Sequence, residues 1–491
     1  MDAMTSLGPN HPRTLPLCKP ENRIYLLIAA ILASSLGFID GSIVAIALPA
    51  MRMSLGATLV EAQWVSNAYM LTLSALILVG GAAGDRFGLA RVFGGGIALF
   101  VIASMACAFA ATPEFLIGAR AVQGLGAAFM VPGSLALISR AYPQHERAKA
   151  IGTWAAAAAV TSALGPIIGG LALTFGGADV WRWIFAVNLP LGLLALYFLF
   201  AKVEQDPSQA ERGLDIPGAL TAVVGLGLIA WSVSGAEHGD TIDSSAVAIF
   251  LLGLAVITLF IRIEAKSPYP MMPLSLFQNP GFSVANAAAF GIYFAFSAIL
   301  MYLPMLVIGA WGESEITTSA AYAPLSVFIA LLSRYSGKLA ARIGPMPLLV
   351  GGSLVLATGY ATLALVIPTQ NFWGAILPAM CLQGVGMGLV VAPLSAAVMD
   401  SVPSHATGTA SGINNAVVRM SGLLAVAVMG SVVAIGYGAA QGPASFGEIM
   451  RDPGHLAASN AAFIRVAWGA SAICLISAAL AAFALRPKMR A

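Results

Sequence analysis

The sequence predicts an all-α polytopic membrane protein: fourteen spanning helices in two six-helix bundles, with an inserted two-helix hairpin. Three observations support this fold class, namely an apolar composition, regularly spaced apolar stretches and an internal repeat. The chain has 491 residues, of which 59% are hydrophobic and only 9% are charged, whereas soluble domains carry about a quarter charged residues. A water-soluble fold could not bury that much apolar surface.

The apolar stretches set the helix count, because a bilayer core takes about 20 apolar residues per spanning helix. Polar breaks divide the chain into spans near 23–49, 59–82, 92–111, 114–139, 149–174, 183–201, 216–235, 244–263, 281–309, 317–339, 345–367, 371–399, 405–437 and 460–485. The alternating segments of about ten residues that are typical of membrane β-barrels do not occur. An even number of spans predicts that both termini lie on one side of the membrane.

The distribution of Lys and Arg predicts which side that is, since these residues favour short cytoplasmic loops. With the N-terminus inside, most of the 24 Lys and Arg residues fall on the inner face, and only Arg52, Arg182, Arg451 and Arg465 fall outside. We therefore expect a multi-pass protein of the cell inner membrane with both termini cytoplasmic. The net charge of +3 reflects this topology, and no basic patch or fold suggests a nucleic-acid partner.

An internal repeat divides the chain in two. Gly81-Ala-Ala-Gly-Asp85-Arg86-Phe-Gly88 follows the second span, and Gly337 to Gly344 shares its pattern roughly 256 residues later. Gln123-Gly124-Leu-Gly126 recurs as Gln383-Gly384-Val-Gly386 at a similar offset. Two parallel repeats of six helices leave about 60 residues for a hairpin. The predicted parts are a cytoplasmic tail (1–22), a first bundle (23–201), a linker with inserted helices (202–264), a second bundle (265–485) and a second tail (486–491).

Six segments carry a family resemblance: Asp40-Gly-Ser-Ile-Val-Ala-Ile-Ala-Leu-Pro49, Gln63-Trp-Val-Ser-Asn67-Ala-Tyr69, Gly81 to Arg91, Arg120-Ala-Val-Gln123-Gly124-Leu-Gly126, Gly165-Pro166-Ile-Ile-Gly169-Gly170, and Trp181-Arg-Trp-Ile-Phe-Ala-Val-Asn188. Together they resemble the fourteen-span drug:proton antiporter branch of the major facilitator superfamily, over nearly the whole chain from Arg23. The resemblance implies the major facilitator fold. The sequence departs from the family pattern at Leu89-Ala90, where basic residues are usual, and at Ala341, which stands where the first repeat has Asp85.

Asp40 is the centre of the predicted chemistry. An ionised carboxylate in the middle of a span costs several kcal/mol unless it faces water or a partner, and its charge responds to burial and to nearby cations. We expect Asp40 to alternate between a proton and a cationic substrate. By resemblance, Arg120, with Gln123 on the same helix face, relays the protonation of Asp40 to the conformational change. The alternative for both charged residues is a structural tie between helices one and four.

Three further groups are candidates. Gly81, Asp85, Arg86, Gly88 and Arg91 are predicted to form a cytoplasmic gating loop, which by resemblance holds the outward-facing state; the alternative is a solvated, topogenic charge cluster. Gly165, Pro166, Gly169 and Gly170 resemble the antiporter motif, and predict a bend packed closely against another helix, or a mere packing groove. Asn67, Tyr69, Asn414, Asn415 and Arg419 are candidate pocket residues, of which the last three, with Asp400, form either a structural network or a further contact for protons or substrate.

The function that the resemblance implies is secondary active export of small lipophilic compounds, cationic ones foremost, such as drugs and biocides, in exchange for protons by alternating access. We expect antibiotic resistance, no cofactor besides the proton gradient, no metal, and a monomer whose partners are the bilayer, the substrate and protons. No HExxH, GxSxG or P-loop pattern occurs, so an enzyme is not expected. A transporter of another small organic solute, an importer included, and a non-transporting membrane sensor remain the alternatives.

Overall fold

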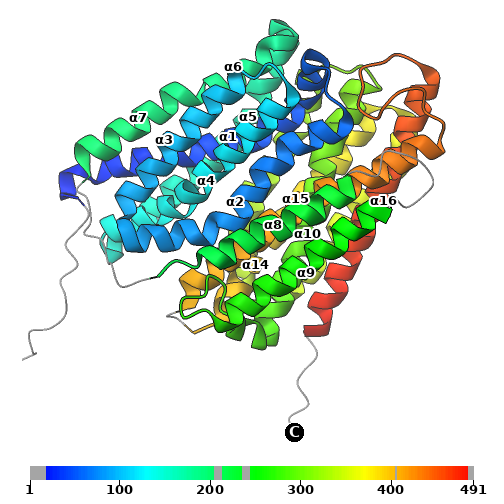
Figure 1. The fold of residues 1–491 in the computed structure, drawn as a ribbon. Coiled ribbons are helices and arrows are strands. Elements are labelled where there is room, and N and C mark those ends of the chain that lie inside the picture. Colours follow the sequence, from blue (N-terminus) through cyan, green and yellow to red (C-terminus); the bar gives the residue numbers. More distant parts are fainter. Residues whose placement is uncertain (1–17, 204–212, 235–243, 404–405, 485–491) are drawn as a thin grey trace, which may run out of the picture.

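The computed structural model describes residues 18–203, 213–234, 244–403 and 406–484, and all regular elements in these ranges are helices (Figure 1). Fourteen helical spans in the described ranges are long and apolar enough to cross a membrane, which confirms the predicted count and fold class. The predicted terminal tails lie almost entirely outside these ranges. We call the face where the first helix begins and the last one ends the terminal face, and the other the opposite face.

The N-terminal half consists of α1 (Arg23–Leu55), α2 (Leu59–Phe87), α3 (Leu89–Ala108), α4 (Pro113–Ala141), α5 (Gln144–Gly176), α6 (Trp181–Ala186) and α7 (Asn188–Lys202), with α6 and α7 sharing one span. Local signals set several ends. Gly56 takes a left-handed conformation (φ +64°) after α1, and Thr58 caps α2 together with Glu61. Pro113 begins α4, where its missing N–H costs no hydrogen bond.

The C-terminal half consists of α10 (Pro280–Gly309), α11 (Glu315–Ala320), α12 (Tyr322–Ile343), α13 (Met346–Val366), α14 (Leu377–Asp400), α15 (Thr407–Ala439) and α16 (Pro453–Ala484), with α11 and α12 in one span. Short 3-10 and π turns connect some of them: η1 (Pro20–Asn22), η2 (Ala178–Val180), η3 (Leu274–Gln278), η4 (Ile367–Thr369) and η5 (Phe372–Ile376). The two central helices α4 and α14 hold equivalent places in their halves. α4 packs on α2 and α3, and α14 packs on α12 and α13.

The repeated Gln-Gly-x-Gly motif accounts for this equivalence. Gly124 lies against the backbone of Tyr69 in α2. A Cβ placed on Gly384 would lie 3.2 Å from the carbonyl oxygen of Pro324, in the first turn of α12. The second glycine of the N-terminal copy, Gly126, packs on the backbone of α3 in the same way. A side chain at any of these positions would push the helices apart, so the glycines permit close packing within the membrane.

The inserted hairpin consists of α8 (Ile216–Ser234) and α9 (Ser244–Lys266). The two helices approach closely at Gly225 and Gly253, where a Cβ would meet the partner helix. α8 packs on α2 and α15, one helix from each half, and lies beside them in Figure 1. α9 is almost entirely exposed outside the bundle. The hairpin therefore lies against the junction of the halves and belongs to the core of neither.

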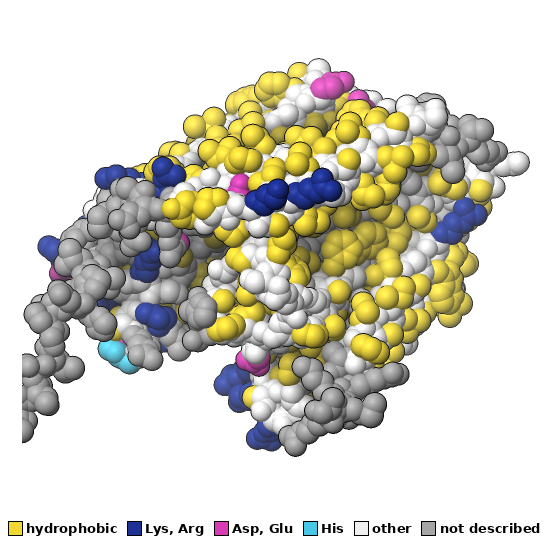
Figure 2. All heavy atoms as spheres, turned by 60° about the horizontal axis from the view of Figure 1, so that its bottom comes forward, with side chains coloured by type: hydrophobic (Ala, Val, Ile, Leu, Met, Phe, Trp, Pro, Cys, Tyr) yellow, Lys and Arg dark blue, Asp and Glu magenta, His cyan; other side chains and the backbone are white. Residues whose placement is uncertain are grey.

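The two halves meet chiefly through three helix pairs: α2 with α15, α1 with α10, and α5 with α11. Specific contacts lie near the opposite face, where Thr174 of α5 donates a hydrogen bond to Glu315 of α11 at 3.1 Å. Among the described helices, α4 and α14 show no comparable packing on each other near the terminal face. Figure 2 turns this face forward and shows the surface hollowed between the two halves. The molecule is thus closed at the opposite face and open at the terminal face.

Candidate functional site

A buried polar triad joins α1 to α4 in the N-terminal half. Asp40 lies at the middle of α1, and Arg120 and Gln123 lie one turn apart on α4. The Arg120 Nη1 donates to Asp40 Oδ2 at 2.6 Å, and Gln123 Nε2 donates to Asp40 Oδ1 at 3.0 Å. Arg120 Nη1 also donates to Gln123 Oε1 at 2.6 Å. The exposed fractions of Asp40, Arg120 and Gln123 are 0%, 2% and 0%, so the structure brings together the three residues that the sequence singled out.

Two further helices support the guanidinium of Arg120. Its Nε donates to the carbonyl oxygen of Val65 in α2 at 3.0 Å, and its Cζ lies 4.3 Å from the ring centroid of Tyr69 and 5.7 Å from that of Phe185. Aromatic faces attract cations, more strongly when water is excluded. The sequence reasoning missed Val65 and Phe185. Both lie in motif segments, but the contact of Val65 comes from its backbone oxygen, which leaves no signal in a sequence.

This arrangement couples the charge of Asp40 to the position of Arg120. In the ionised form, the carboxylate receives one hydrogen bond on each oxygen and balances the buried guanidinium. A proton on Asp40 would cancel the ion pair and leave a buried positive charge uncompensated, which costs several kcal/mol unless the arginine finds another partner. Protonation of one side chain can therefore drive a rearrangement between α1 and α4.

The candidate pocket residues of α2 have different environments. Tyr69 is buried under Arg120 and belongs to the support of the triad. Asn67 is fully buried, and neither of its amide atoms has a hydrogen-bond partner among the described residues. Gln63, one turn before Asn67, is also buried with an unpaired Oε1, and its side chain packs on Gly430 of α15. Unpaired buried amides are costly, and that of Gln63 lies where α2 meets α15 of the other half.

The polar residues predicted in α15 do not form one cluster. Asn414 donates to Asn286 of α10 at 3.1 Å, whereas Asn415 is exposed and donates to Ser411 of its own helix. Asp400 is exposed at the end of α14, and none of the contacts of Asn414, Asn415 or Arg419 involves it. The prediction of a hydrogen-bonded network among these residues is therefore wrong. The sequence reasoning also missed Asn286 of α10, the partner of Asn414.

Arg419 of α15 is partly buried. It lies within electrostatic range of the buried Tyr69 and Tyr293. No hydrogen bond or ion pair joins it to another residue of the described part of the chain. Because Asp40 already balances Arg120, Arg419 adds a positive charge near Tyr69 that has no counter-ion there.

The predicted gating loop is mostly helical. α2 continues to Phe87 and α3 begins at Leu89, so Gly88 alone separates them, with a positive φ of 97°. Gly81, Asp85, Arg86 and Arg91 therefore lie on helices, which corrects the prediction of a loop. Asp85 accepts a hydrogen bond from Arg140 of α4 at 2.7 Å, with both side chains partly exposed. Arg86 lies over the ring of Phe87 at 5.2 Å.

The antiporter motif brings α5 against both halves. A Cβ on Gly165 would lie 2.6 Å from Ser42 Oγ, and one on Gly169 would lie 2.6 Å from the side chain of Ile43, both in α1. A Cβ on Gly170 would lie 2.8 Å from the carbonyl oxygen of Glu315 in α11. Pro166 lies inside α5 between these contacts. The motif thus combines close packing on α1 with contact to the other half at the opposite face.

The cysteines and other metal-ligating side chains form no second site among the described residues. Among the described residues, Cys18, Cys107, Cys381 and Cys474 form no disulfide, and the Cys107 Sγ lies 3.7 Å from Gln123 Oε1 as a weak donor. In the ranges that the structure describes, no group of three or more His, Cys, Asp or Glu side chains could hold a metal ion.

Comparison with known proteins places this geometry in a family. The family model described as Major Facilitator Superfamily matches residues 30–427. The chain is 33% identical over 419 residues to the multidrug resistance protein Stp of Mycobacterium tuberculosis, which covers 84% of this chain and 76% of that protein. It is 30% identical over 411 residues to the methylenomycin A resistance protein of Streptomyces coelicolor, with 82% and 85% covered.

Solved structures show the same fold at low sequence identity. A bacterial homolog of the human lysosomal transporter Spinster, in an inward-facing and unoccupied conformation, aligns with a TM-score of 0.65 and 17% identity, covering 95% of this chain and 97% of that one.

Proposed function

This chain belongs to the major facilitator superfamily, and we propose that it exports small lipophilic compounds from the cytoplasm in exchange for protons. The export of drugs follows from the relatives, which are named as multidrug and antibiotic resistance proteins. The observation that carries the proton coupling is the buried triad of Asp40, Arg120 and Gln123, which contains an acid able to take up a proton. No cofactor is required, because the proton gradient supplies the free energy.

The transport cycle uses the charge balance of the triad. With Asp40 ionised, Arg120 is held between α1 and α4, and a cationic substrate that enters from the cytoplasm competes with Arg120 for the carboxylate. After the halves move, a proton from outside binds Asp40 and displaces the substrate. The proton leaves to the cytoplasm in the inward-facing state, which restores the pair of Asp40 and Arg120. Because Asp40 binds either a proton or the cationic substrate but not both at once, uptake of one is coupled to release of the other.

We infer from the distribution of Lys and Arg residues that the terminal face lies in the cytoplasm. Thirteen Lys and Arg residues lie toward this face within the described ranges: Lys19, Arg23, Arg86, Arg91, Arg140, Arg147, Lys149, Lys202, Arg262, Lys266, Arg334, Lys338 and Arg342. On the opposite face, Arg52, Arg182 and Arg451 lie at helix ends or in a connection. Such an excess favours the cytoplasmic side. With the terminal face in the cytoplasm, the opening there corresponds to an inward-facing state, and we propose that the protein works as a monomer in the inner membrane.

A drug-susceptibility panel in an efflux-deficient host tests the proposal. The wild type is expected to protect against several lipophilic cations, and Asp40→Asn to protect no better than the empty vector. Glu114→Gln is the matched control, because Glu114 is an exposed acid in the first turn of α4, the helix that carries Arg120. Equal protection by wild type and Asp40→Asn would remove Asp40 from the coupling.

The direction of transport distinguishes an exporter from an importer and from a non-transporting sensor. In everted vesicles, an exporter that exchanges substrate for protons accumulates a fluorescent cation and releases protons from the acidified lumen when the substrate is added. Accumulation in right-side-out vesicles instead would indicate an importer. If neither flux occurs in vesicles that contain the folded protein, the chain is a sensor and not a transporter.

A further inference from the structure

The connection between α15 and α16 folds over the opposite face, and we call it the outer strap (residues 440–452). It is anchored to its own half through α10. Met450 N donates to the carbonyl oxygen of Gly309 at 3.2 Å, and the ring of Phe446, 1% exposed, packs edge-on against Tyr302 at 6.2 Å between centroids. The strap is therefore a packed part of the C-terminal half and not a loose loop.

Hydrogen bonds to the flanking helices fix the shape of the strap. The buried His455 of α16 donates through Nε2 to the carbonyl oxygen of Glu448 at 3.0 Å, because a carbonyl can only accept. Its Nδ1 lies 2.6 Å from the hydroxyl of Tyr437 in α15, and the same hydroxyl accepts from Ala444 N at 3.2 Å. All of these groups belong to the C-terminal half, so the strap keeps its shape without help from the other half.

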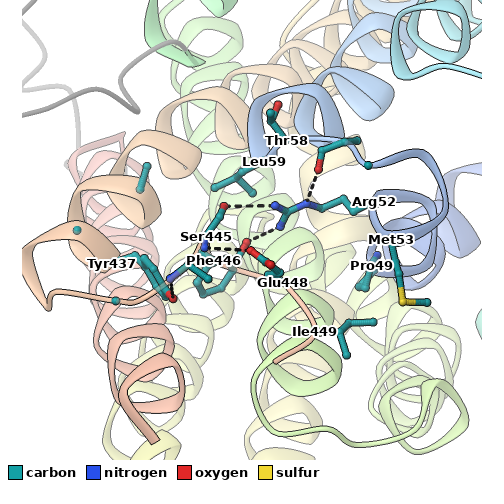
Figure 3. A pocket seen from close by; sticks show the side chains of 17 residues that line it. Pro49, Arg52, Met53, Thr58, Leu59, Tyr437, Ser445, Phe446, Glu448 and Ile449 are labelled. Carbon is teal, nitrogen blue, oxygen red and sulfur yellow. Dashed lines mark hydrogen bonds between the residues drawn. The ribbon is translucent and has the colours of Figure 1, made fainter. Parts of the chain in front are cut away.

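One arginine of the N-terminal half binds this preformed strap. Arg52, in the last turn of α1, is 8% exposed. Its Nη1 donates to the carbonyl oxygen of Phe446 at 2.6 Å, and its Nη2 donates to Ser445 Oγ at 3.3 Å (Figure 3). Its Nε donates to Ala57 in its own half at 3.3 Å. The guanidinium thus bridges the two halves, because it donates hydrogen bonds to acceptors in both of them.

A cavity of about 680 Å³ lies beside this contact, between the ends of α1, α2 and α15 and the strap. Its lining includes Met53, Leu59 and Ile449, and Figure 3 shows Arg52 reaching across it to the strap. Apolar packing between the halves is therefore interrupted here. At this point the hydrogen bonds of Arg52 connect α1 to the strap.

We propose that Arg52 is the positioning residue that keeps the outer gate shut in the inward-facing state, by binding the outer strap. The inference rests on the proposed transport function, since export requires the halves to part at the opposite face. That movement must break the hydrogen bonds to Phe446 and Ser445, while the bond to Ala57 and the folded strap can persist. Arg52 therefore sets the balance between the closed and open outer face and touches neither Asp40 nor its partners.

Cysteine labelling from outside tests this role without any need for substrate. The reporter is Ser66→Cys, with the four native cysteines replaced by Ser. Ser66 is partly buried where the halves meet, and its Oγ, in α2, lies 3.9 Å from Met301 Sδ of α10. A membrane-impermeant maleimide reaches this cysteine only when the outer face opens. We expect Arg52→Gln to raise the labelling rate roughly tenfold, because two hydrogen bonds across the interface are lost.

Arg182→Gln is the matched control. Arg182 is an arginine of the same face that also donates to backbone carbonyl oxygens, those of Ala108 and Ala110, but these lie within its own half. Its replacement should leave the labelling rate unchanged. Ser445→Ala removes one strap contact, and Arg52→Lys keeps a single donor group, so both should give intermediate rates. These two variants carry the test if Arg52→Gln does not accumulate as folded protein.

Equal labelling of wild type, Arg52→Gln and Ser445→Ala would overturn the proposal. Equal increases in Arg52→Gln and Arg182→Gln would also overturn it, because they would indicate general loosening of the face. If the wild type exports nothing while Arg52→Gln still raises labelling, the transport function fails and the role of Arg52 at the gate stands. The two proposals are thereby separated.

Discussion

Asp40 and Arg120 form an ion pair buried between α1 and α4, with 2.6 Å between the guanidinium Nη1 and the carboxylate Oδ2 and almost no exposed surface on either side chain. Replacing only one residue of such a pair is costly, because the charge of the other residue stays buried without a partner. The same property that allows proton coupling therefore makes single substitutions destabilising. A test of coupling has to separate the two effects.

We expect Asp40→Asn to lower the free energy of unfolding by about 3–5 kcal/mol, the usual cost of an uncompensated buried charge. The double variant Asp40→Asn/Arg120→Gln removes both charges and should recover most of that loss. Neither variant should export a cationic substrate. The thermal stability of the purified proteins and efflux from loaded cells measure the two quantities. Export by the stable double variant would contradict the assignment of Asp40 as the coupling acid.

Gly170 closes the opposite face by letting α5 approach α11. In Gly170→Ala, the new Cβ would lie 2.8 Å from the carbonyl oxygen of Glu315 and would also clash with Ser319. Overpacking of this kind costs about 1–3 kcal/mol, here only in the closed state, so we expect roughly a tenfold loss of export. Gly152→Ala is the control in the same helix, since a Cβ there meets nothing within 4 Å. Equal export by the two variants would show that the contact is not part of closure.

The pair of Asp85 and Arg140 has a different character, because both side chains are partly exposed. Exposed pairs contribute about 0–1 kcal/mol to stability, so Asp85→Asn should leave the melting temperature nearly unchanged. If this segment controls gating, export should still fall several-fold. Glu146→Gln breaks a comparable exposed pair with Arg23 on the same face and should not reduce export. A parallel fall in both variants would indicate a general effect of surface charge.

The sequence predicted the fold well because the membrane simplifies the problem. Fourteen apolar stretches, the Lys and Arg bias and the repeated Gln-Gly-x-Gly motif are all visible without knowledge of contacts. The central pair was also predictable, because Asp40 and Arg120 are charged residues deep in the first repeat, and charges at that depth need partners.

The errors concern features that depend on packing. The segment from Gly81 to Arg91 resembled a loop because glycine and charged residues favour turns in solution, but close packing and the pair of Asp85 with Arg140 keep it helical up to Gly88. The support of Arg120 by Val65 comes from a backbone oxygen, which every residue possesses. The pairing of Asn414 with Asn286 joins residues 128 positions apart, and no local pattern indicates it.

Arg419 permits a prediction about substrate charge. Its guanidinium lies within electrostatic range of Tyr69, whose ring contacts Arg120 of the central triad, and it has no counter-ion among the described residues. A positive charge there repels cationic substrates and attracts anionic ones. We therefore expect Arg419→Gln to increase export of a lipophilic cation roughly fivefold, which corresponds to about 1 kcal/mol, and to decrease export of an anion of similar size by a comparable factor. Efflux of two dyes of matched size and opposite charge measures both changes. Arg465→Gln, at an exposed position in α16, should change neither rate. If Arg419→Gln instead lowers the export of both dyes equally, the guanidinium stabilises the fold or the gate and does not select substrates by charge.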